Sequence, residues 1–483
     1  MTETSPKPQC CLALPWLGYL LFFIVLVGTV LLGIMIISVT ERRAESVKRT
    51  MLYEIPPYEM DASVWGRNFP RQYDSWKRTE DMSFKSKYGG SKPKDYLEVT
   101  PEYVVLFGGF PFSLEYNQGR GHSYALEDVL SSLRIGDATG AACWECKSPD
   151  VPRLMNELGL EEFTAKKLHE IKHEINNPIS CFDCHDENTL ALRSLRPAVL
   201  AGFQSLGKTM ESLSHQEKRS AVCSQCHSTY HFSETGRVTF PWTKGLQAEN
   251  VEEYYRQTQA SDWIHPISNV RMIKTRHPDY EIFTTSLHYA RGVSCADCHM
   301  PYTTEGAEKF SNHHLRSPLA NISGTCAVCH RWGEEDTVKQ VELIQDRVKE
   351  VRDRAMDMLV KAHFDIAACM EIGADDGELS TVRDELRYAQ MYWDFIASAN
   401  AMGFHSPQES QRILTTALEK AAHIRLECTR ILAKYGYTEP VLYPDYRTKE
   451  QAGTIVKAFL SGDRPSLLQK NDTANPVSFE PEI

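Results

Sequence analysis

The sequence has no Ser/Gly-rich linker between residues 143 and 330, and its cysteine pairs do not recur at a fixed spacing. A chain of 483 residues could form two or three domains, but without a linker or a repeat we expect this stretch to form one. Basic residues are not in excess either, because Lys and Arg number 53 against 64 Asp and Glu, for a formal net charge of -11. No nucleic-acid partner is therefore expected.

Ten of the 14 cysteines form Cys-x-x-Cys pairs. Four pairs are followed directly by histidine: Cys181, Cys184 and His185; Cys223, Cys226 and His227; Cys295, Cys298 and His299; and Cys326, Cys329 and His330. In a c-type haem site the two thiols form thioethers with the porphyrin and the adjacent histidine binds the iron. Such pairs also build zinc sites, but a histidine directly after the second cysteine in all four favours haem.

The first pair, Cys143 and Cys146, is followed by Lys147 and lacks the histidine. Alone, this motif would be more typical of a zinc half-site, a redox dithiol or two surface thiols. Beside four intact motifs it predicts a fifth haem c, with an amine on its iron. Electron-transfer haems generally have two strong protein ligands, so we expect this unusual haem to leave one face open for chemistry.

Four cysteines remain outside the motifs: Cys10, Cys11, Cys369 and Cys428. Cys369 and Cys428 lie in sequence with a helical pattern, where buried thiols are expected rather than a disulfide. Cys10 and Cys11 lie beside a long apolar segment. Acylation is one alternative there, and unmodified thiols are expected.

Residues 12–39 carry no charge and are dominated by Leu, Ile, Val, Phe and Gly. This run exceeds the ~20 residues that span a bilayer, so it is a transmembrane helix or a long signal sequence. No small-x-small cleavage site follows it, which favours an uncleaved anchor. The basic residues Arg42, Arg43, Lys48 and Arg49 would place the following chain in the cytoplasm. Because haem c is attached outside the cytoplasm, we expect instead the periplasmic or extracytoplasmic face of the membrane.

The pattern predicts a mainly α protein with little β structure. Residues 1–40 would form a cytoplasmic stub and anchor, 41–335 a five-haem catalytic region with a haem-packed core, 336–440 a region of long helices and 441–483 a loosely packed tail. Residues 41–110 look irregular. Apolar residues recur with a helical period over 338–371, 376–402 and 408–435, and a short helix is expected near 454–460. Long amphipathic helices cover a core or form an oligomer interface.

One Cys-x-x-Cys-Lys motif, four Cys-x-x-Cys-His motifs and long carboxyl-terminal helices, in this order, resemble pentahaem cytochrome c nitrite reductase, the ammonia-forming enzyme. Local sequences extend the resemblance over most of the chain after the anchor: Arg120-Gly121-His122, Leu133-Arg134, Cys146-Lys147-Ser148-Pro149-Asp150, Lys274-Thr275-Arg276-His277-Pro278, Cys298-His299-Met300-Pro301 and Phe404-His405-Ser406-Pro407. The resemblance implies six-electron reduction of nitrite to ammonium at a lysine-ligated haem c, fed by four bis-histidine haems.

The resemblance also implies the second axial ligands of these four haems, numbered here in the order of their motifs. They are His313 for haem 2, His122 for haem 3, His405 for haem 4 and His288 for haem 5, with His314 as an alternative to His313.

Over the open face of haem 1 the resemblance places Arg134, Tyr230 and His277. A charged arginine there can hold the nitrite oxygens. A histidine can deliver protons near neutral pH, and a tyrosine can hydrogen-bond intermediates. Because the net charge should repel nitrite at long range, a local basic channel is expected, with Arg134, Lys274 and Arg276 as candidates.

Many members of that family hold calcium beside haem 1. The ligands are a glutamate directly before the distal tyrosine, a glutamine directly before the distal histidine and two backbone carbonyls. This chain has Thr229 and Arg276 at those positions. Calcium prefers anionic and neutral oxygen ligands, so we predict that calcium is absent and that the Arg276 guanidinium replaces it. The alternative is an Arg276 side chain directed to solvent.

Location and resemblance together imply the partners. Electrons would come from a membrane multihaem quinol dehydrogenase, and the long helices would form a homodimer. Two other functions stay open. One is an electron-carrier multihaem cytochrome whose haems are all six-coordinate, and the other is a reductase of hydroxylamine or sulfite with a similar pocket.

Overall fold

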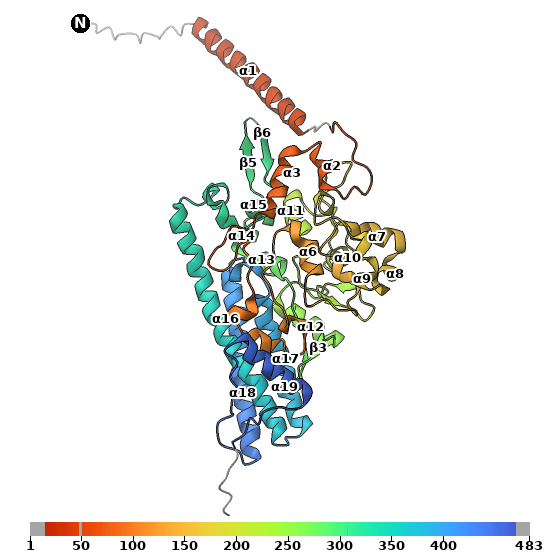
Figure 1. The fold of residues 1–483 in the computed structure, drawn as a ribbon. Coiled ribbons are helices and arrows are strands. Elements are labelled where there is room, and N and C mark those ends of the chain that lie inside the picture. Colours follow the sequence, from red (N-terminus) through yellow and green to blue (C-terminus); the bar gives the residue numbers. More distant parts are fainter. Residues whose placement is uncertain (1–14, 48–50, 307, 470–483) are drawn as a thin grey trace, which may run out of the picture. The chain divides into compact units, whose positions relative to one another are not determined.

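The computed structural model describes residues 15–47, 51–306 and 308–469 (Figure 1). The chain divides into two compact units, one ending at Glu54 and the other beginning at Ile55. The first contains helix α1 (Pro15–Val47), whose residues Trp16–Glu41 are long and apolar enough to cross a membrane. A signal sequence has the same properties, so the uncleaved anchor stays a prediction. Cys10 and Cys11 lie outside the described residues.

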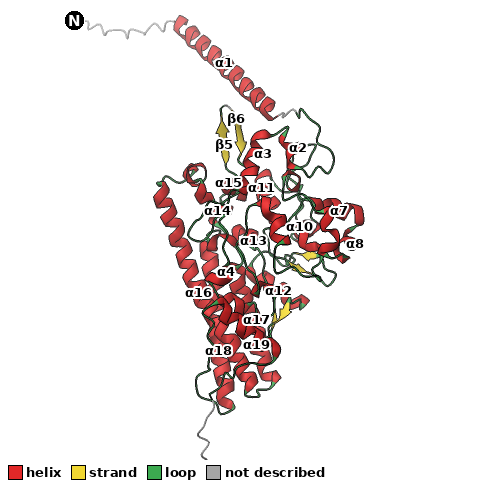
Figure 2. Cartoon of the chain, viewed as in Figure 1, coloured by secondary structure: helices red, strands yellow, loops and turns green. Residues whose placement is uncertain are grey.

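The second unit is mainly helical, which confirms the predicted class, and its described strands are short (Figure 2). Short helices occupy the part of the chain that contains the cysteine motifs: α2 (Ala62–Gly66), α3 (Pro70–Lys77), α4 (Tyr96–Val99), α5 (Glu102–Leu106), α6 (Ala125–Leu130), α7 (Asp150–Leu158), α8 (Leu160–Ala165), α9 (Leu168–Ile171), α10 (Pro197–Ser205), α11 (His215–Ser224), α12 (Ala248–Thr258), α13 (Asp279–Thr284), α14 (Leu287–Ala290) and α15 (Cys295–His299). The first four of these lie in sequence that was expected to be irregular.

The strands form antiparallel pairs. They are β1 (His231–Phe232) with β2 (Val238–Thr239), β3 (Trp263–Ile264) with β4 (Arg271–Met272), and β5 (Tyr302–Glu305) with β6 (Glu308–Ser311).

Three long helices follow the last motif: α16 (Glu334–Glu371), α17 (Asp376–Ala397) and α18 (Pro407–Lys434). They lie where the apolar period predicted long helices, and they pack against one another (Figure 1). In α16 the buried residues Val341, Val348, Ala355 and Leu359 lie seven or four positions apart, which is one face of a helix. Helix α17 ends five residues before the predicted boundary because the backbone becomes extended at Ala399, with a φ of -74° and a ψ of 145°, before it turns left-handed at Ala401.

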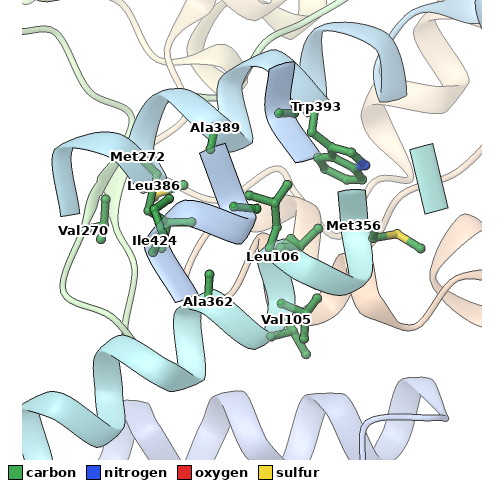
Figure 3. Close-up of a cluster of buried hydrophobic side chains, with 14 of the residues drawn as sticks. Val105, Leu106, Val270, Met272, Met356, Ala362, Leu386, Ala389, Trp393 and Ile424 are labelled. Carbon is green, nitrogen blue, oxygen red and sulfur yellow. The ribbon is translucent and has the colours of Figure 1, made fainter. Parts of the chain in front are cut away.

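These helices form the largest hydrophobic core together with α5 and β4. Figure 3 shows part of it, where Val105, Leu106, Met272, Met356, Leu386, Trp393 and Ile424 converge. Helix α19 (Lys449–Ser461) buries Ile455 and Phe459 against the same core, and Leu467 is buried beyond it. The tail after residue 440 is therefore firmly packed up to this point, contrary to the expectation of a loose segment.

Cys369 and Cys428 are both fully buried in this core and carry free thiols, as predicted. The Cys369 thiol donates to the Cys428 carbonyl, with 3.4 Å between sulfur and oxygen. They behave as small apolar residues between α16 and α18.

Two buried histidines join α16 to the β3–β4 turn. His265 and His363 stack with ring centroids 3.8 Å apart. His265 Nε2 donates to the Val105 carbonyl and His363 Nε2 donates to Gln390 Oε1, both at 2.8 Å. Each Nδ1 accepts a bond, one from a backbone amide and one from a serine hydroxyl. Burial lowers the pKa of His363 to about 4 and that of His265 well below its usual value.

We expect the free energy of unfolding to fall as the pH drops from about 6.5 to about 4, because the unfolded histidines bind protons that the folded pair excludes. Each histidine would contribute up to about 1.4 kcal/mol per pH unit in this window. His363→Gln should therefore flatten the pH dependence of denaturant unfolding. His173→Gln, at an exposed position, is the control. If the unfolding free energy of His363→Gln depended on pH as steeply as that of the wild type, the buried histidine pair would not be the source of this pH dependence.

Candidate active site and haem-binding segments

Each cysteine motif lies on a short helical turn. In three of the histidine motifs the histidine amide donates to the carbonyl of the first cysteine, at 3.0 Å for His185, 2.9 Å for His227 and 2.8 Å for His330. The other histidine motif coincides with α15. In the first motif the Lys147 amide donates to the Trp144 carbonyl at 2.9 Å, which closes a tighter turn. Local backbone geometry therefore sets the residue after the second cysteine beside both thiols.

Thiols of different motifs lie close together. A hydrogen bond with Cys226 raises the pKa of Cys146, and one with Cys295 raises the pKa of Cys223. Motif 3 is thus the neighbour of motif 1 on one side and of motif 4 on the other.

Motifs 4 and 5 also meet. Burial and the neighbouring Cys326 raise the pKa of Cys298 to about 12. Cys298 and His314 line a small cavity here, so His314 lies beside motif 4. The neighbouring attachment segments therefore follow the order 1, 3, 4, 5.

Arg196 ties motif 2 to motifs 1 and 3. Its guanidinium is buried and forms an ion pair with Asp183 of motif 2. It also donates to Gln225 Oε1 of motif 3 at 2.8 Å, to the Glu145 carbonyl of motif 1 and to the Ser148 carbonyl at 3.2 Å. A buried guanidinium is costly unless its donors are satisfied, and here three attachment segments satisfy them.

Three imidazole pairs have the separation that a shared metal requires. The ring centroids are 6.3 Å apart in each of the pairs His185 and His313, His288 and His330, and His299 and His405. With metal–nitrogen bonds of about 2 Å on either side, two imidazoles on one metal have centroids about 6 Å apart. These residues therefore fit an iron atom between the rings.

Motif 3 is arranged differently. The His227 ring lies 6.2 Å from the ring of His277. His122, the predicted partner of His227, is close to both His227 and Lys147, and burial together with these two groups lowers its pKa to about 4. Four groups thus gather in one region, and the assignment of His122 to haem 3 stays a prediction.

His277 is solvent-accessible and adopts a left-handed backbone, with a φ of 51°. This conformation is uncommon for a residue other than glycine. Pro278 follows it, and the Asp279 amide donates to the His277 carbonyl at 2.7 Å. The turn therefore fixes the direction in which the imidazole leaves the backbone.

Arg134 and Tyr230 lie near the first motif, the one that ends in Lys147. The Arg134 guanidinium lies 4.5 Å from the centre of the Phe112 ring and 3.9 Å from Glu115 Oε2, and it is half-buried. Burial raises the pKa of Tyr230, and the charges of Arg276 and Arg134 oppose that rise. Two cations therefore act on the tyrosine from the surrounding loops.

Arg276 does not point to solvent, because it is 7% exposed. Its Nη1 donates to the carbonyl oxygens of Tyr230 and Lys274, at 3.1 Å and 2.9 Å. Its Nη2 forms an ion pair with Asp262 Oδ1 at 2.6 Å. Burial lowers the Arg276 pKa, but Asp262 outweighs this effect and the pKa is raised overall. The cation is thus held permanently between two backbone carbonyls and a carboxylate.

Lys274 does not line a basic channel, contrary to the expectation from the sequence. Its ammonium is 1% exposed and lies 2.7 Å and 2.9 Å from the two carboxylate oxygens of Asp394 on α17. The rings of Phe107 and Phe112 lie 4.7 Å and 5.0 Å from it. A paired and buried cation exerts little attraction on an incoming anion, so Arg134 is the one candidate of the three that is partly exposed.

Comparisons with known proteins identify the family of this chain. Two relatives named cytochrome c-552 are similar over nearly the full length: one from Porphyromonas gingivalis, 42% identical over 458 residues and covering 92% of each chain, and one from Bacteroides fragilis, 44% identical over 459 residues and covering 93% of each chain. The sequence model of the family described as cytochrome c552 matches residues 61–467. The chain belongs to the cytochrome c552 family.

A solved cytochrome c nitrite reductase from Desulfovibrio desulfuricans has the same fold, with a TM-score of 0.75 and 30% identity over 78% of this chain and 88% of that one. That protein is a catalytic subunit with two calcium sites. Membership of the cytochrome c552 family implies covalently bound haem c, and the paired imidazoles and clustered cysteine motifs fit that group.

Several residues that shape this cytochrome c552-type site carry no signal in the sequence. Arg196 lies outside every motif, Asp262 comes from a segment with no recognisable pattern, and the helical period around Asp394 does not mark it as a partner of Lys274. Their roles depend on contacts across 13 to 120 positions of the chain, so only the folded structure reveals them.

Proposed function

We propose that this chain is the catalytic subunit of an ammonia-forming nitrite reductase, an oxidoreductase with five haem c groups. The observation that supports this most is the lysine-bearing motif beside an accessible His277, because an amine-ligated haem with a polar open face suits substrate binding better than electron transfer. The solved relative named as a nitrite reductase provides the substrate class.

In this proposal Cys143, Cys146 and Lys147 would hold a haem that would supply electrons and an iron site for nitrite. Lys147 must be neutral to act as a ligand. Arg134, which stays charged, would hold the nitrite oxygens and stabilise negative charge as the N–O bonds weaken. His277 and Tyr230 would donate hydrogen bonds to those oxygens and pass on the protons that the reaction consumes.

The remaining four motifs would carry bis-histidine haems that conduct electrons. Their order of contact suggests a path from haem 5 through haem 4 and haem 3 to haem 1, with haem 2 alongside. Arg276 would replace a calcium ion beside haem 1, since its guanidinium bonds to the two carbonyls that such an ion would use. We predict that the protein needs no calcium.

The amino-terminal helix would keep the protein at the extracytoplasmic face of the membrane, where a multihaem quinol dehydrogenase would supply electrons. The long helices α16 to α18 would form the interface of a homodimer. Both partners stay predictions from the resemblance.

Product analysis tests the proposed function. Purified protein with an artificial reductant should convert nitrite to ammonium without releasing nitric oxide, and a high-spin haem signal should respond to nitrite or cyanide. If the protein forms no ammonium and all its haems are low-spin, the result would favour the electron-carrier function instead. If the protein reduces hydroxylamine or sulfite much faster than nitrite, that substrate would define its function.

Lys147→His tests the amine ligand directly. Haem content should stay at five per chain because the thioether cysteines are unchanged, whereas the ligand-field spectrum should shift and nitrite turnover should fall. Lys172→His, at an exposed position, is the control. Full activity with an unaltered spectrum would remove Lys147 from the iron.

A further inference from the structure

A single carboxylate lies between two of the proposed axial histidines. Asp279, the first residue of α13, is buried. Its Oδ1 lies 3.3 Å from His405 Nδ1, and its Oδ2 lies 3.7 Å from His227 Nδ1. His227 and His405 are far apart in the sequence, and each is proposed to bind a different iron through its other nitrogen.

Two hydrogen bonds hold this carboxylate in place. The Asn400 amide donates to Asp279 Oδ1, and the Asn400 side chain donates to Oδ2, both at 2.9 Å. Asn400 belongs to the turn that ends α17 before the left-handed residues. Among the described residues, no lysine or arginine forms an ion pair with Asp279, so its charge is directed at the two imidazoles.

Other axial histidines have neutral partners at the same ring position. The Nδ1 atoms of His185, His299 and His313 lie 2.9 Å, 3.0 Å and 2.8 Å from backbone carbonyl oxygens. A full negative charge beside an imidazole makes it a more electron-rich ligand than a neutral carbonyl does. His227 and His405 are therefore distinguished from these three histidines by Asp279.

The location of Asp279 gives this charge a role in electron flow. Motifs 3 and 4 are neighbours through Cys223 and Cys295, so their haems would be adjacent. When one electron passes between them, haem 4 is oxidised and haem 3 is reduced, and no proton needs to leave the carboxylate. A charge shared by both ligands shifts the reduction potentials of both couples in the same direction, which leaves the difference between them, and so the driving force of this step, nearly unchanged.

We propose that Asp279 is a positioning residue that lowers the reduction potentials of the two haems ligated by His227 and His405 together. This rests on the axial assignments of the proposed function. Neither contact of Asp279 with a histidine has the geometry of a strong hydrogen bond. His405 Nδ1 has no hydrogen-bond partner among the described residues, and His227 Nδ1 lies 3.7 Å from the carboxylate. The carboxylate thus acts mainly through its charge.

Redox titration of the holoprotein with Asp279→Asn tests the proposal. The reduction potentials of two of the five haems should rise, and the equilibrium constant for their reduction should increase at least tenfold, which is about 59 mV for one electron. The potentials of the other three haems should change less. Glu281→Gln is the matched control on the same helix. Burial raises the pKa of Glu281 to about 8, and unlike Asp279 this carboxyl forms no contact with the proposed axial histidines, so its replacement should shift no pair of couples together.

Five loaded haems with wild-type potentials in Asp279→Asn would overturn the proposal, as would an equal rise in all five couples or a rise in one alone. Should that variant not retain its haems, Asn400→Ala decides instead. It keeps the charge and removes one donor that offsets it, so the same two couples should fall, and an absent or upward shift would overturn the proposal. Ammonium formation by the wild type is measured separately, so a failure of the proposed function remains distinguishable.

Discussion

Alanine at Arg134 or at His277 is expected to lower nitrite turnover at least tenfold while haem content stays at five. Neither residue belongs to an attachment motif, so haem insertion should proceed. Loss of the arginine removes the charge that holds the nitrite oxygens, and loss of the histidine removes a hydrogen-bond donor for the developing products. Single groups of these two kinds typically contribute about 10²–10⁴-fold to a rate.

Steady-state turnover with an artificial donor and haem content by absorbance are the measurements. Arg464→Ala and His173→Ala, both at exposed positions, serve as controls. The two losses should differ in kind. Arg134→Ala should also raise the KM for nitrite because this cation is the partly exposed one, whereas His277→Ala should act mainly on kcat. Wild-type kinetics in both variants would refute the distal-site assignment.

Arg276→Gln is expected to destabilise the protein by about 3–5 kcal/mol, the usual effect of leaving one partner of a buried ion pair uncompensated. Asp262 would keep its charge without a cation, and the carbonyl oxygens of Tyr230 and Lys274 would lose a shared donor. Since Tyr230 and His277 adjoin these carbonyls, turnover should also fall. Asp262→Asn combined with Arg276→Gln should recover much of the stability, and denaturant unfolding of the four proteins in this cycle measures the coupling.

Calcium gives a second measurement of the same site. Chelation should leave wild-type turnover intact, because a dication beside a guanidinium would be repelled. Thr229→Glu with Arg276→Gln rebuilds the ligand pair of the calcium-binding relatives and should create a calcium requirement. Stoichiometric calcium in the purified wild type, or chelator inactivation that added calcium reverses, would show that Arg276 does not replace the ion.

Local patterns predicted the long helices and the attachment motifs because both depend on spacing within a few residues. The apolar period located α16 to α18, but α16 begins four residues before its predicted start, and α17 ends early because nothing in the sequence marks Ala399 as extended. The prediction that Lys274 lines a basic channel was wrong because it depended on the charge of the residue alone. Its partner Asp394 lies 120 residues away, and such a pairing becomes visible only when α17 is packed against the loop. Arg196 and Asp279 were missed for the same reason.

The Asp262–Arg276 pair has a consequence for the conditions in which the distal loop keeps its shape. A bound ion stabilises a fold by an amount that grows with its free concentration relative to its dissociation constant. A guanidinium that belongs to the chain cannot be diluted away or captured by phosphate or a competing chelator. On the proposal that Arg276 replaces the ion, we therefore expect the loop from Lys274 to His277 to be as stable in a calcium-poor medium as in a calcium-rich one.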